Sequence, residues 1–147
     1  MSRSPAAESD AAARLRAVVG KLSRRLDATA RGTGLTSSQL SALGVVARQG
    51  PIRLAELAEI EHVNPTMLSR IVGALVDDGL LRRRPDPDDR RAGLVEVTPQ
   101  GRRTHDRLRA ERGRALGDGL AALSPEDRAI VEAALPALEA LVVAVRR

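Results

Sequence analysis

The segment from Arg83 to Thr98 constrains the fold of this chain more than any other part of its sequence. It predicts a β-hairpin, because a short strand from Leu80 to Arg84 leads into a turn rich in proline and aspartate, and an alternating strand follows from Leu94 to Thr98. Arginines flank the tip of the turn on both sides. Taken alone, such a segment favours an ordinary solvated surface hairpin. The helices that precede it in the sequence favour instead a hairpin that forms part of a binding surface.

Two helices are expected at the start of the chain. We expect residues 1–9 to be disordered and a first helix to run from near Asp10 to Arg31, where apolar residues recur at helical spacing. The segment Thr36-Ser37-Ser38-Gln39 has the pattern of a capping box, which predicts that a second helix begins there. Gly50-Pro51 ends this second helix.

The next two helices have the arrangement of a helix-turn-helix unit. A short helix from Arg53 to Ile60 is followed by a tight turn from Glu61 to Val63. The helix after it begins with Asn64 as N-cap and Pro65 in its first turn, and Gly79 ends it. In such a unit the second helix, called the recognition helix, lies in the major groove of duplex DNA and reads base edges with its N-terminal half.

Two further helices are expected after the hairpin. One begins at Thr98-Pro99 and runs toward Leu120, and the other begins at Ser124-Pro125, with Pro136 expected to kink or divide it. Three glycines predict a break or hinge in the first of them: Gly113, Gly117 and Gly119. The expected fold is therefore mainly α with a small β-hairpin wing, an α+β class that joins a winged helix-turn-helix lobe to a helical dimerisation region.

Composition narrows the class of partner. The net charge of +5 and the pI of about 11.2 indicate a polyanionic partner, either nucleic acid or a membrane surface. Without Phe, Tyr or Trp the chain cannot stack bases on aromatic rings, which argues against RNA and single strands and leaves duplex DNA. The absence of cysteine argues against a thiol redox sensor and Cys-ligated zinc. With only two histidines, a His-based metal site would need carboxylates or a second chain, and neither a metal nor a bound cofactor is expected.

Neither a secretion signal nor a membrane span is expected. The N-terminus lacks an apolar core, and no window holds the roughly 18 apolar residues that a span requires. We therefore expect a cytoplasmic protein without a membrane partner. An enzyme is not expected either, because Ser69 and His62 lack the glycine elbow of a nucleophile, and the chain shows no phosphate loop or metal cluster.

The start of the recognition helix holds four candidates for DNA contact. Arg70 has the side chain to bind guanine O6 and N7, a contact worth roughly 1–3 kcal/mol of discrimination, and Thr66 and Ser69 lie in the same half of the helix. Asn64 and Thr66 are placed for phosphates near the helix N-terminus, where the helix dipole favours anions. The alternative for Arg70 is a solvated helix residue without a ligand.

The hairpin supplies a second set of cations. Arg91 is the candidate for insertion into a narrow, A·T-rich minor groove. Asp89 is placed to hold the guanidinium of Arg91 in one rotamer by a charge-assisted contact. Without such a role the three acidic residues at this tip would oppose DNA binding. Arg84 and Arg90 are expected to contact phosphates.

These segments resemble the MarR family of bacterial winged helix-turn-helix regulators. The run from Asp86 to Gly101 is similar to the family's wing signature, in which an aspartate and an arginine are characteristic at the positions of Asp89 and Arg91. Less specific segments resemble its third helix, its recognition helix and the start of its wing: Leu54 to Ala58, Ser69-Arg70 and Leu75 to Leu81. In the order and length of its elements the resemblance covers nearly the whole chain.

The resemblance implies a homodimer in which N- and C-terminal helices interlock and two winged lobes bind a pseudo-palindrome with half-sites about 10 bp apart. Apolar stripes on these helices support the dimer, and the alternative is an internal helix pair within a monomer. The residues expected at the dimer interface are Leu15, Val18, Leu22, Leu123, Ile130, Leu138, Leu141, Val142 and Val145. The expected domains are a dimerisation helix at 10–34, the winged lobe at 35–98, and linker and dimerisation helices at 99–147.

The function that the resemblance implies is transcriptional repression, relieved in many family members by a small anionic phenolic ligand. It therefore implies a small anionic or aromatic effector, for which the sequence assigns no residues. Family members that sense peroxide use a cysteine and those that sense zinc use histidine clusters, and this chain has neither. The alternative function is a nucleoid-type protein that coats DNA through charge without sequence preference. The sequence defines neither the operator, nor the target genes, nor the sign of regulation.

Overall fold

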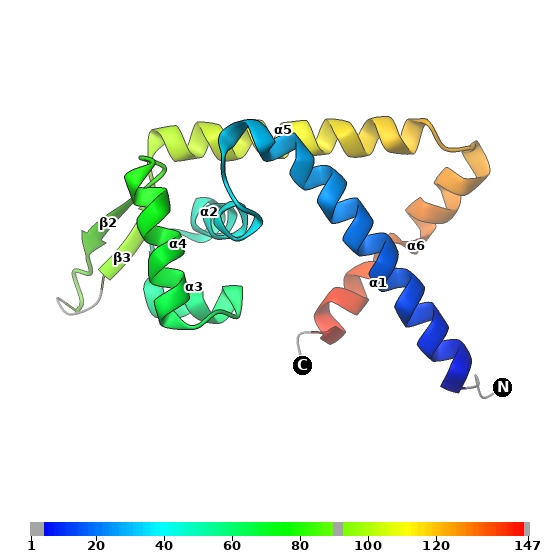
Figure 1. The fold of residues 1–147 in the computed structure, drawn as a ribbon, viewed down its shortest axis with the longest axis horizontal. Helices are drawn as coiled ribbons and strands as arrows, with labels where there is room; N and C mark the ends of the chain where they lie inside the picture. Colours follow the sequence, from blue (N-terminus) through cyan, green and yellow to red (C-terminus); the bar gives the residue numbers. More distant parts are fainter. Residues whose placement is uncertain (1–4, 90–92, 146–147) are drawn as a thin grey trace. The chain divides into compact units, whose positions relative to one another are not determined.

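The computed structural model describes residues 5–89 and 93–145, which fall into two compact units divided after Ala110 (Figure 1). The expected class is confirmed, since the chain is mainly helical with one small antiparallel sheet. The elements of the first unit are α1 (Pro5–Asp27), a 3-10 helix (Ala28–Thr33), α2 (Ser37–Gln49), β1 (Ile52–Arg53), α3 (Leu54–Glu61), α4 (Pro65–Asp77), β2 (Leu81–Pro85), β3 (Gly93–Val97) and the start of α5 (Pro99–Ala121). The second unit holds the rest of α5 and α6 (Pro125–Val145).

Helix α1 differs from the prediction at both ends. It begins at Pro5, which suits a first helical turn, so residues 5–9 are helical where we expected disorder. It ends at Asp27, and the 3-10 helix Ala28–Thr33 replaces the expected last turns. Within that segment Ala30 is buried in a small cluster with residues of α2 and α5. Such packing is not visible in the apolar spacing of α1.

The starts of α2 and α4 follow the predicted caps. Thr36 Oγ1 accepts a hydrogen bond from the backbone N–H of Gln39 (3.3 Å), and Gln39 Oε1 accepts one from the N–H of Thr36 (2.7 Å), which completes the capping box. Asn64 Oδ1 accepts from the N–H of Met67 (2.8 Å) and so caps α4. Gly79 follows α4 with a φ of +72°, the left-handed conformation that ends a helix at low steric cost in glycine.

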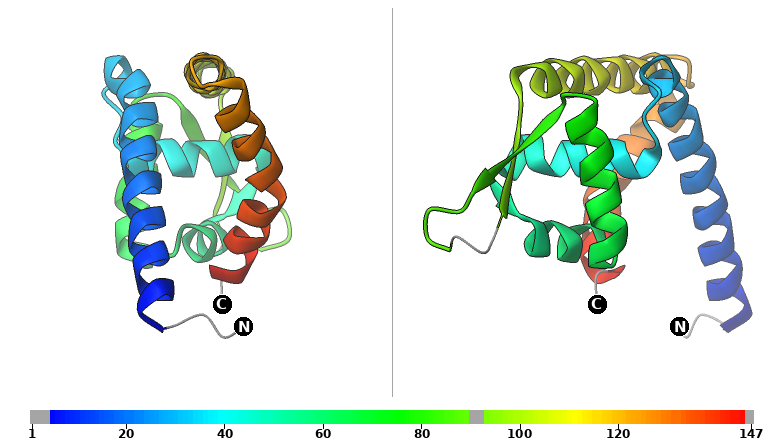
Figure 2. Two further views of the ribbon diagram at one scale, coloured as in Figure 1. Left: turned by 90° about the vertical axis from the view of Figure 1, so that its right-hand side faces the viewer. Right: turned by 60° about the vertical axis from the view of Figure 1, so that its left-hand side comes forward.

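An aliphatic core holds α2, α3 and α4 against the sheet. Its largest fully buried side chains are Leu43, Val46, Leu57, Leu68, Val72, Leu75, Leu81 and Val95. The sheet has the strand order β1-β3-β2, with Ile52 opposite Val95 and Leu81 opposite Val97. Strand β1 was not predicted, because two residues are too few to show the alternation of a strand. Figure 2 shows the β2–β3 hairpin extending away from the three helices.

Helices α5 and α6 are each continuous, which corrects the predicted break in α5 and the predicted division of α6. Helix α5 runs through all three of its glycines without a break, since each glycine weakens a helix by only about 1 kcal/mol and keeps its backbone donor. Helix α6 continues through Pro136, so this proline does not divide it. Among the described residues, no helix has both the length and the apolar character needed to traverse a bilayer.

Candidate nucleic-acid interface

Helix α4 carries the predicted recognition face. Its buried side consists of Leu68, Ile71, Val72 and Leu75, which recur at helical spacing. Thr66, Ser69 and Arg70 are exposed, so the structure brings these three predicted residues together on the outer side of one helix. Met67 lies beside them and is 48% exposed, although sequence reasoning did not select it. An apolar side chain on such a face can contact the methyl group of thymine.

The N-terminus of α4 is open to solvent. Asn64 and Pro65 are both exposed there. Asn64 uses its Oδ1 for the helix cap, which leaves the amide nitrogen of the same side chain as a hydrogen-bond donor toward a ligand. Because the aligned peptide dipoles of a helix add partial positive charge at this end, the position suits a phosphate group.

The turn between α3 and α4 depends on a residue in the left-handed conformation. His62 has φ 52° and ψ 40°, a region that few residues other than glycine adopt. The backbone N–H of Val63 donates to the carbonyl of Ala58 (3.1 Å), and Ser41 Oγ donates to Glu61 Oε1 (2.9 Å). These bonds fix the end of α3, and the direction in which α4 leaves the turn follows from them.

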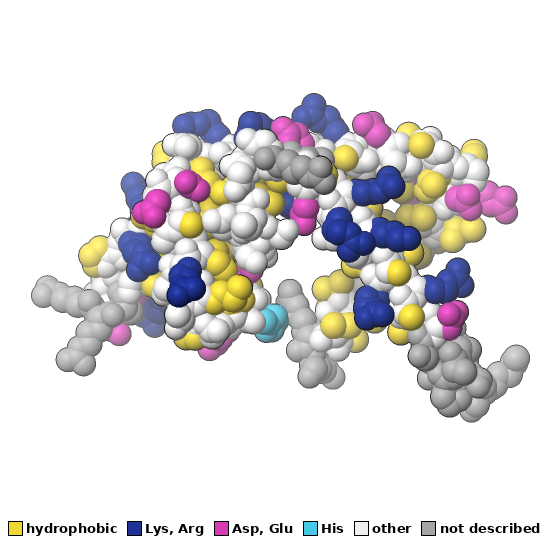
Figure 3. Space-filling view, viewed as in Figure 1, with side chains coloured by type: hydrophobic (Ala, Val, Ile, Leu, Met, Phe, Trp, Pro, Cys, Tyr) yellow, Lys and Arg dark blue, Asp and Glu magenta, His cyan; other side chains and the backbone are white. Residues whose placement is uncertain are grey.

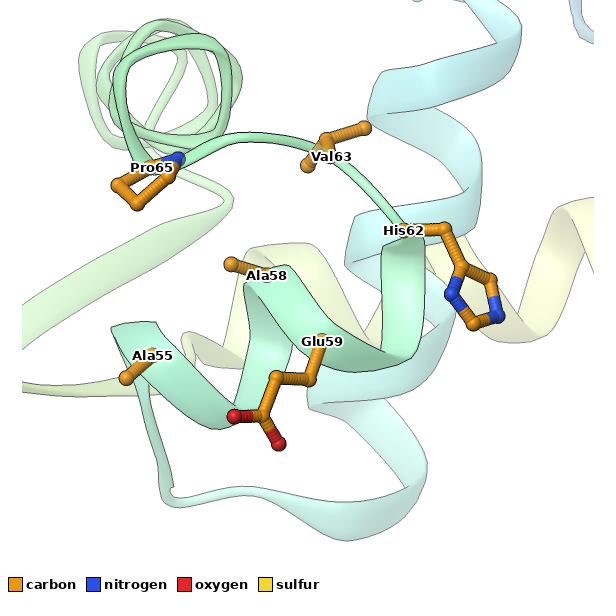
Figure 4. Close-up of a pocket in the computed structure, with 6 residues that line it drawn as sticks. All are labelled: Ala55, Ala58, Glu59, His62, Val63 and Pro65. Atoms are coloured by element: carbon orange, nitrogen blue, oxygen red, sulfur yellow. The ribbon is translucent and has the colours of Figure 1, made fainter.

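A pocket of about 530 Å³ lies beside this turn (Figure 4) and is lined by Ala55, Ala58, Glu59, His62, Val63 and Pro65. The carboxylate of Glu59 and the imidazole of His62 point in different directions, so they do not converge on one point. In the described part of the chain no three side chains of the kinds that bind metal ions come together.

The β2–β3 hairpin, residues 81–97, forms the wing and presents arginines along its first strand. Arg82 stands opposite Glu96, and its Nε lies 2.6 Å from Glu96 Oε1. Arg84 Nη1 lies 3.5 Å from Glu96 Oε2, and the side chain of Arg84 is 47% exposed. Because a guanidinium carries five donors, both arginines can still donate to a phosphate. Arg84 was a predicted contact residue, whereas Arg82 was not singled out.

The tip of the wing contains one buried carboxylate. Asp86 is 3% exposed; its Oδ2 accepts a hydrogen bond from Arg53 Nε (2.7 Å), and its Oδ1 accepts one from the backbone N–H of Asp88 (2.9 Å). The N–H of Asp88 and the guanidinium of Arg53 hold the pKa of Asp86 below its ordinary value, while burial opposes them. Sequence reasoning grouped the three tip carboxylates and missed that one of them faces the protein.

The remaining wing residues are only partly described. Asp89 is exposed at the end of the described part of the tip. Arg90 and Arg91 lie outside the described residues, so their contacts with DNA and the contact between Asp89 and Arg91 stay predictions. Figure 3 shows basic side chains over the part of the first unit that contains α4 and the wing.

Helices α1 and α6 each present apolar side chains to solvent. Leu15 is half-buried, and the other residues expected at a dimer interface are exposed: Val18, Leu22, Leu123, Ile130, Leu138, Leu141, Val142 and Val145. Helix α6 buries none of its side chains within this chain. Stripes of this kind are a typical property of helices that pack against a partner.

Comparison with known proteins gives three kinds of similarity. A sequence model of the MarR family matches residues 35–92. An HTH-type transcriptional regulator of Mycobacterium tuberculosis is 35% identical over 137 residues, which are 92% of this chain and 96% of that protein.

Two solved structures share the fold. A MarR family protein from Bacillus stearothermophilus superposes with a TM-score of 0.83 at 19% identity, over 97% of this chain and 99% of that chain. A mutant of MepR from Staphylococcus aureus, bound to an oligodeoxyribonucleotide, superposes with a TM-score of 0.68 at 16% identity, over 89% and 96% of the two chains.

Proposed function

Because this chain belongs to the MarR family of DNA-binding transcription regulators, we propose that it represses transcription as a homodimer bound to a pseudo-palindromic operator. The observation that carries this proposal is the exposed polar side of α4, which lies opposite the buried side of the same helix and in one unit with the arginine-bearing wing.

The recognition helix reads the operator in the major groove. Arg70 donates to guanine, Thr66 and Ser69 contact base edges or phosphates, and the open N-terminus at Asn64 binds a phosphate. The fold shared with a regulator that was solved with an oligodeoxyribonucleotide supports this docking. Each well-placed bidentate contact contributes roughly 1–3 kcal/mol of discrimination between bases.

The wing binds the neighbouring backbone and minor groove. Arg84 contacts phosphate, as does Arg90, while Arg91 enters the minor groove with Asp89 holding its guanidinium. Arg82 and Arg84 on β2 support the phosphate contacts, because both are exposed and share a single carboxylate, that of Glu96.

Two copies of the chain pair through the apolar stripes of α1 and α6. The exposure of Val18, Ile130 and Val142 in a single chain supports this pairing, because burying such side chains removes apolar surface from water. Two recognition helices then meet half-sites about 10 bp apart on one side of the duplex.

A small anionic or aromatic effector relieves repression. A pocket of about 460 Å³ between the end of α1 and the start of α2 supports this part of the proposal. Arg24 supplies a cation at the pocket, and Leu35 and Leu40 supply apolar walls, which suit a carboxylate on a small apolar body. Asp27 also lines the pocket, and its carboxylate accepts a hydrogen bond from Ser37 Oγ (2.9 Å).

The test is binding to duplex fragments from the region upstream of the protein's own gene, at near-physiological salt, against an excess of unrelated DNA. The DNA carries the fluorophore, because the protein has no aromatic residue. Arg70→Ala is expected to abolish the competition-resistant complex. Arg128→Ala, another exposed helical arginine but on α6 and paired with Glu132, is the matched control and is expected to bind normally.

Equal affinity for every fragment would instead favour a protein that coats DNA through charge, or a regulator whose operators lie elsewhere in the genome. The salt dependence does not separate the two functions, since a dimer with about eight phosphate contacts already has a log–log slope near −7.

A further inference from the structure

Arg53 occupies a position where another residue type would stabilise the helix better. It is the N-cap of α3, with φ −70° and ψ 144°, and it makes no capping hydrogen bond with its side chain. Ser, Thr, Asp and Asn are preferred at this position, because their short side chains accept a hydrogen bond from the first turn. The guanidinium of an arginine has no acceptor, so the N–H groups in the first turn of α3 lack a side-chain cap.

The side chain of Arg53 reaches the wing. Its Nε donates to Asp86 Oδ2 at 2.7 Å, across 33 positions of the sequence. Asp86 is 3% exposed and also accepts from the N–H of Asp88, so both of its carboxylate oxygens are engaged. Arg53 directly precedes the first helix of the helix-turn-helix unit as its N-cap, and Asp86 lies in the turn of the wing.

Backbone pairing between β1 and the wing is short. Strand β1 pairs with β3 through only two residue pairs, Ile52 with Val95 and Arg53 with Leu94. Strands β2 and β3 end their pairing at Pro85 and Gly93. Asp86 is the first residue beyond that pairing, so its contact with Arg53 acts where the backbone ladder has ended.

We propose that Arg53 and Asp86, together called the wing clamp, position the wing against the recognition-helix unit and thereby set the affinity for DNA. This inference rests on the proposed function. Both are positioning residues. A wing that is already ordered contacts the DNA backbone at a fixed distance from α4, so binding does not require the further loss of conformational entropy that ordering a loop would cause. Removing Arg53 leaves the buried Asp86 without its cation, and removing the charge of Asp86 takes away the charged hydrogen-bond acceptor of Arg53 Nε. The exposed turn can then relax toward water without unfolding the core.

The test is a double-mutant cycle on DNA affinity with Arg53→Ala, Asp86→Asn and the double variant. We expect each single variant to bind the operator about tenfold more weakly, and the double variant to bind no more weakly than the worse single. Arg128→Ala, Glu132→Ala and their double form the matched control, since that exposed ion pair lies on α6 and is expected to leave affinity unchanged. Far-UV circular dichroism checks that each variant is folded.

A second readout does not need DNA. Amide hydrogen exchange of residues 93–97 should accelerate in both single variants, while that of residues 42–47 in the core of α2 stays at the wild-type rate. If Arg53→Ala fails to fold, Arg53→Lys keeps the cation and is expected to lose affinity by a smaller factor than Asp86→Asn.

Several results would overturn the clamp. Additive losses in the double variant would show that the two residues act separately. Unchanged exchange at 93–97 would show that the pair does not order the wing. Arg53 would instead be a direct phosphate ligand if two results came together. Asp86→Asn would bind DNA with wild-type affinity, and Arg53→Ala would reduce the slope of log affinity against log salt concentration by about one. If the wild-type chain binds no DNA, the proposed function fails, and the exchange rates still decide whether the clamp orders the wing.

Discussion

Gly101 lies in the first turn of α5, where that helix passes the carbonyl group of Leu80. A Cβ atom at this position would lie 1.9 Å from the oxygen of Leu80 and 3.0 Å from Cγ2 of Val97. Because the nearer obstacle is backbone, only a shift of α5 or of the loop after α4 can relieve the clash. We expect Gly101→Ala to lower the free energy of unfolding by about 1–3 kcal/mol, measured by urea unfolding with circular dichroism.

Gly113→Ala is the matched control in the same helix. A Cβ atom there meets no heavy atom within 4 Å, so the substitution should raise the free energy of unfolding by up to about 1 kcal/mol. A loss of stability at Gly113 similar to that at Gly101 would mean that α5 tolerates no side chain in general, and the steric explanation would be wrong.

Asp86 gives the fold a dependence on pH with a defined sign. The pKa of Asp86 is lowered in the folded state, first by the N–H of Asp88 and then by Arg53. Its ionised form therefore stabilises the fold above the unfolded pKa of about 3.9, and this contribution is lost as the pH falls through the folded pKa. The difference in unfolding free energy between wild type and Asp86→Asn should be constant from pH 5 to 8 and shrink below about pH 4. A difference that does not change over this range would show that the carboxylate is not the stabilising group.

At the scale of single elements, the sequence predicts helix ends better than it predicts contacts between elements. The capping box from Thr36 to Gln39, the Asn64 cap and the left-handed Gly79 are each defined within one turn of chain. Their hydrogen bonds connect residues three apart, so the residue types alone specify them. The polar side of α4 was predictable for the same reason, because helical spacing alone separates it from the buried side.

Contacts between distant segments were not predictable in this way. Strand β1 exists because Ile52 and Arg53 pair with β3, about 40 positions later in the chain. The burial of Asp86 likewise depends on Arg53, and neither residue shows this in its own neighbourhood. The exposed Met67 was missed because methionine in a helix usually indicates core, and only the packed structure places it outside.

Helix α5 provides a prediction at this scale. Its glycines suggested a hinge, yet the helix is continuous and Gly117 and Gly119 meet no heavy atom within 4 Å of an added Cβ. We expect the double substitution Gly117→Ala/Gly119→Ala to raise the free energy of unfolding by about 1–2 kcal/mol and to leave DNA affinity unchanged. Thermal unfolding and the labelled operator fragment measure the two quantities. If affinity falls while stability rises, bending in this segment is needed for binding, and the hinge hypothesis returns.

At the scale of the whole molecule, DNA affinity and oligomeric state should be coupled. One lobe offers a single recognition helix, whereas a dimer places two on one duplex and adds their contacts. Leu141 is 40% exposed on the apolar stripe of α6 in the single chain. Burying an aspartate there costs far more than burying leucine, because an unpaired charge must lose its hydration. We expect Leu141→Asp to give a monomer in sedimentation velocity and to lose operator binding at the same time.

Val143→Asp separates the interface from a general effect of charge on α6. Val143 is 65% exposed, and at 3.6 residues per turn it lies on the side of the helix opposite the stripe that contains Leu141, Leu138 and Val145. The same charge at this position should leave both the dimer and the operator complex intact. If Leu141→Asp remains a dimer, α6 does not form the interface. If it becomes a monomer that still binds with wild-type affinity, the two recognition helices do not act together, and the pseudo-palindromic operator is the part of the proposal that fails.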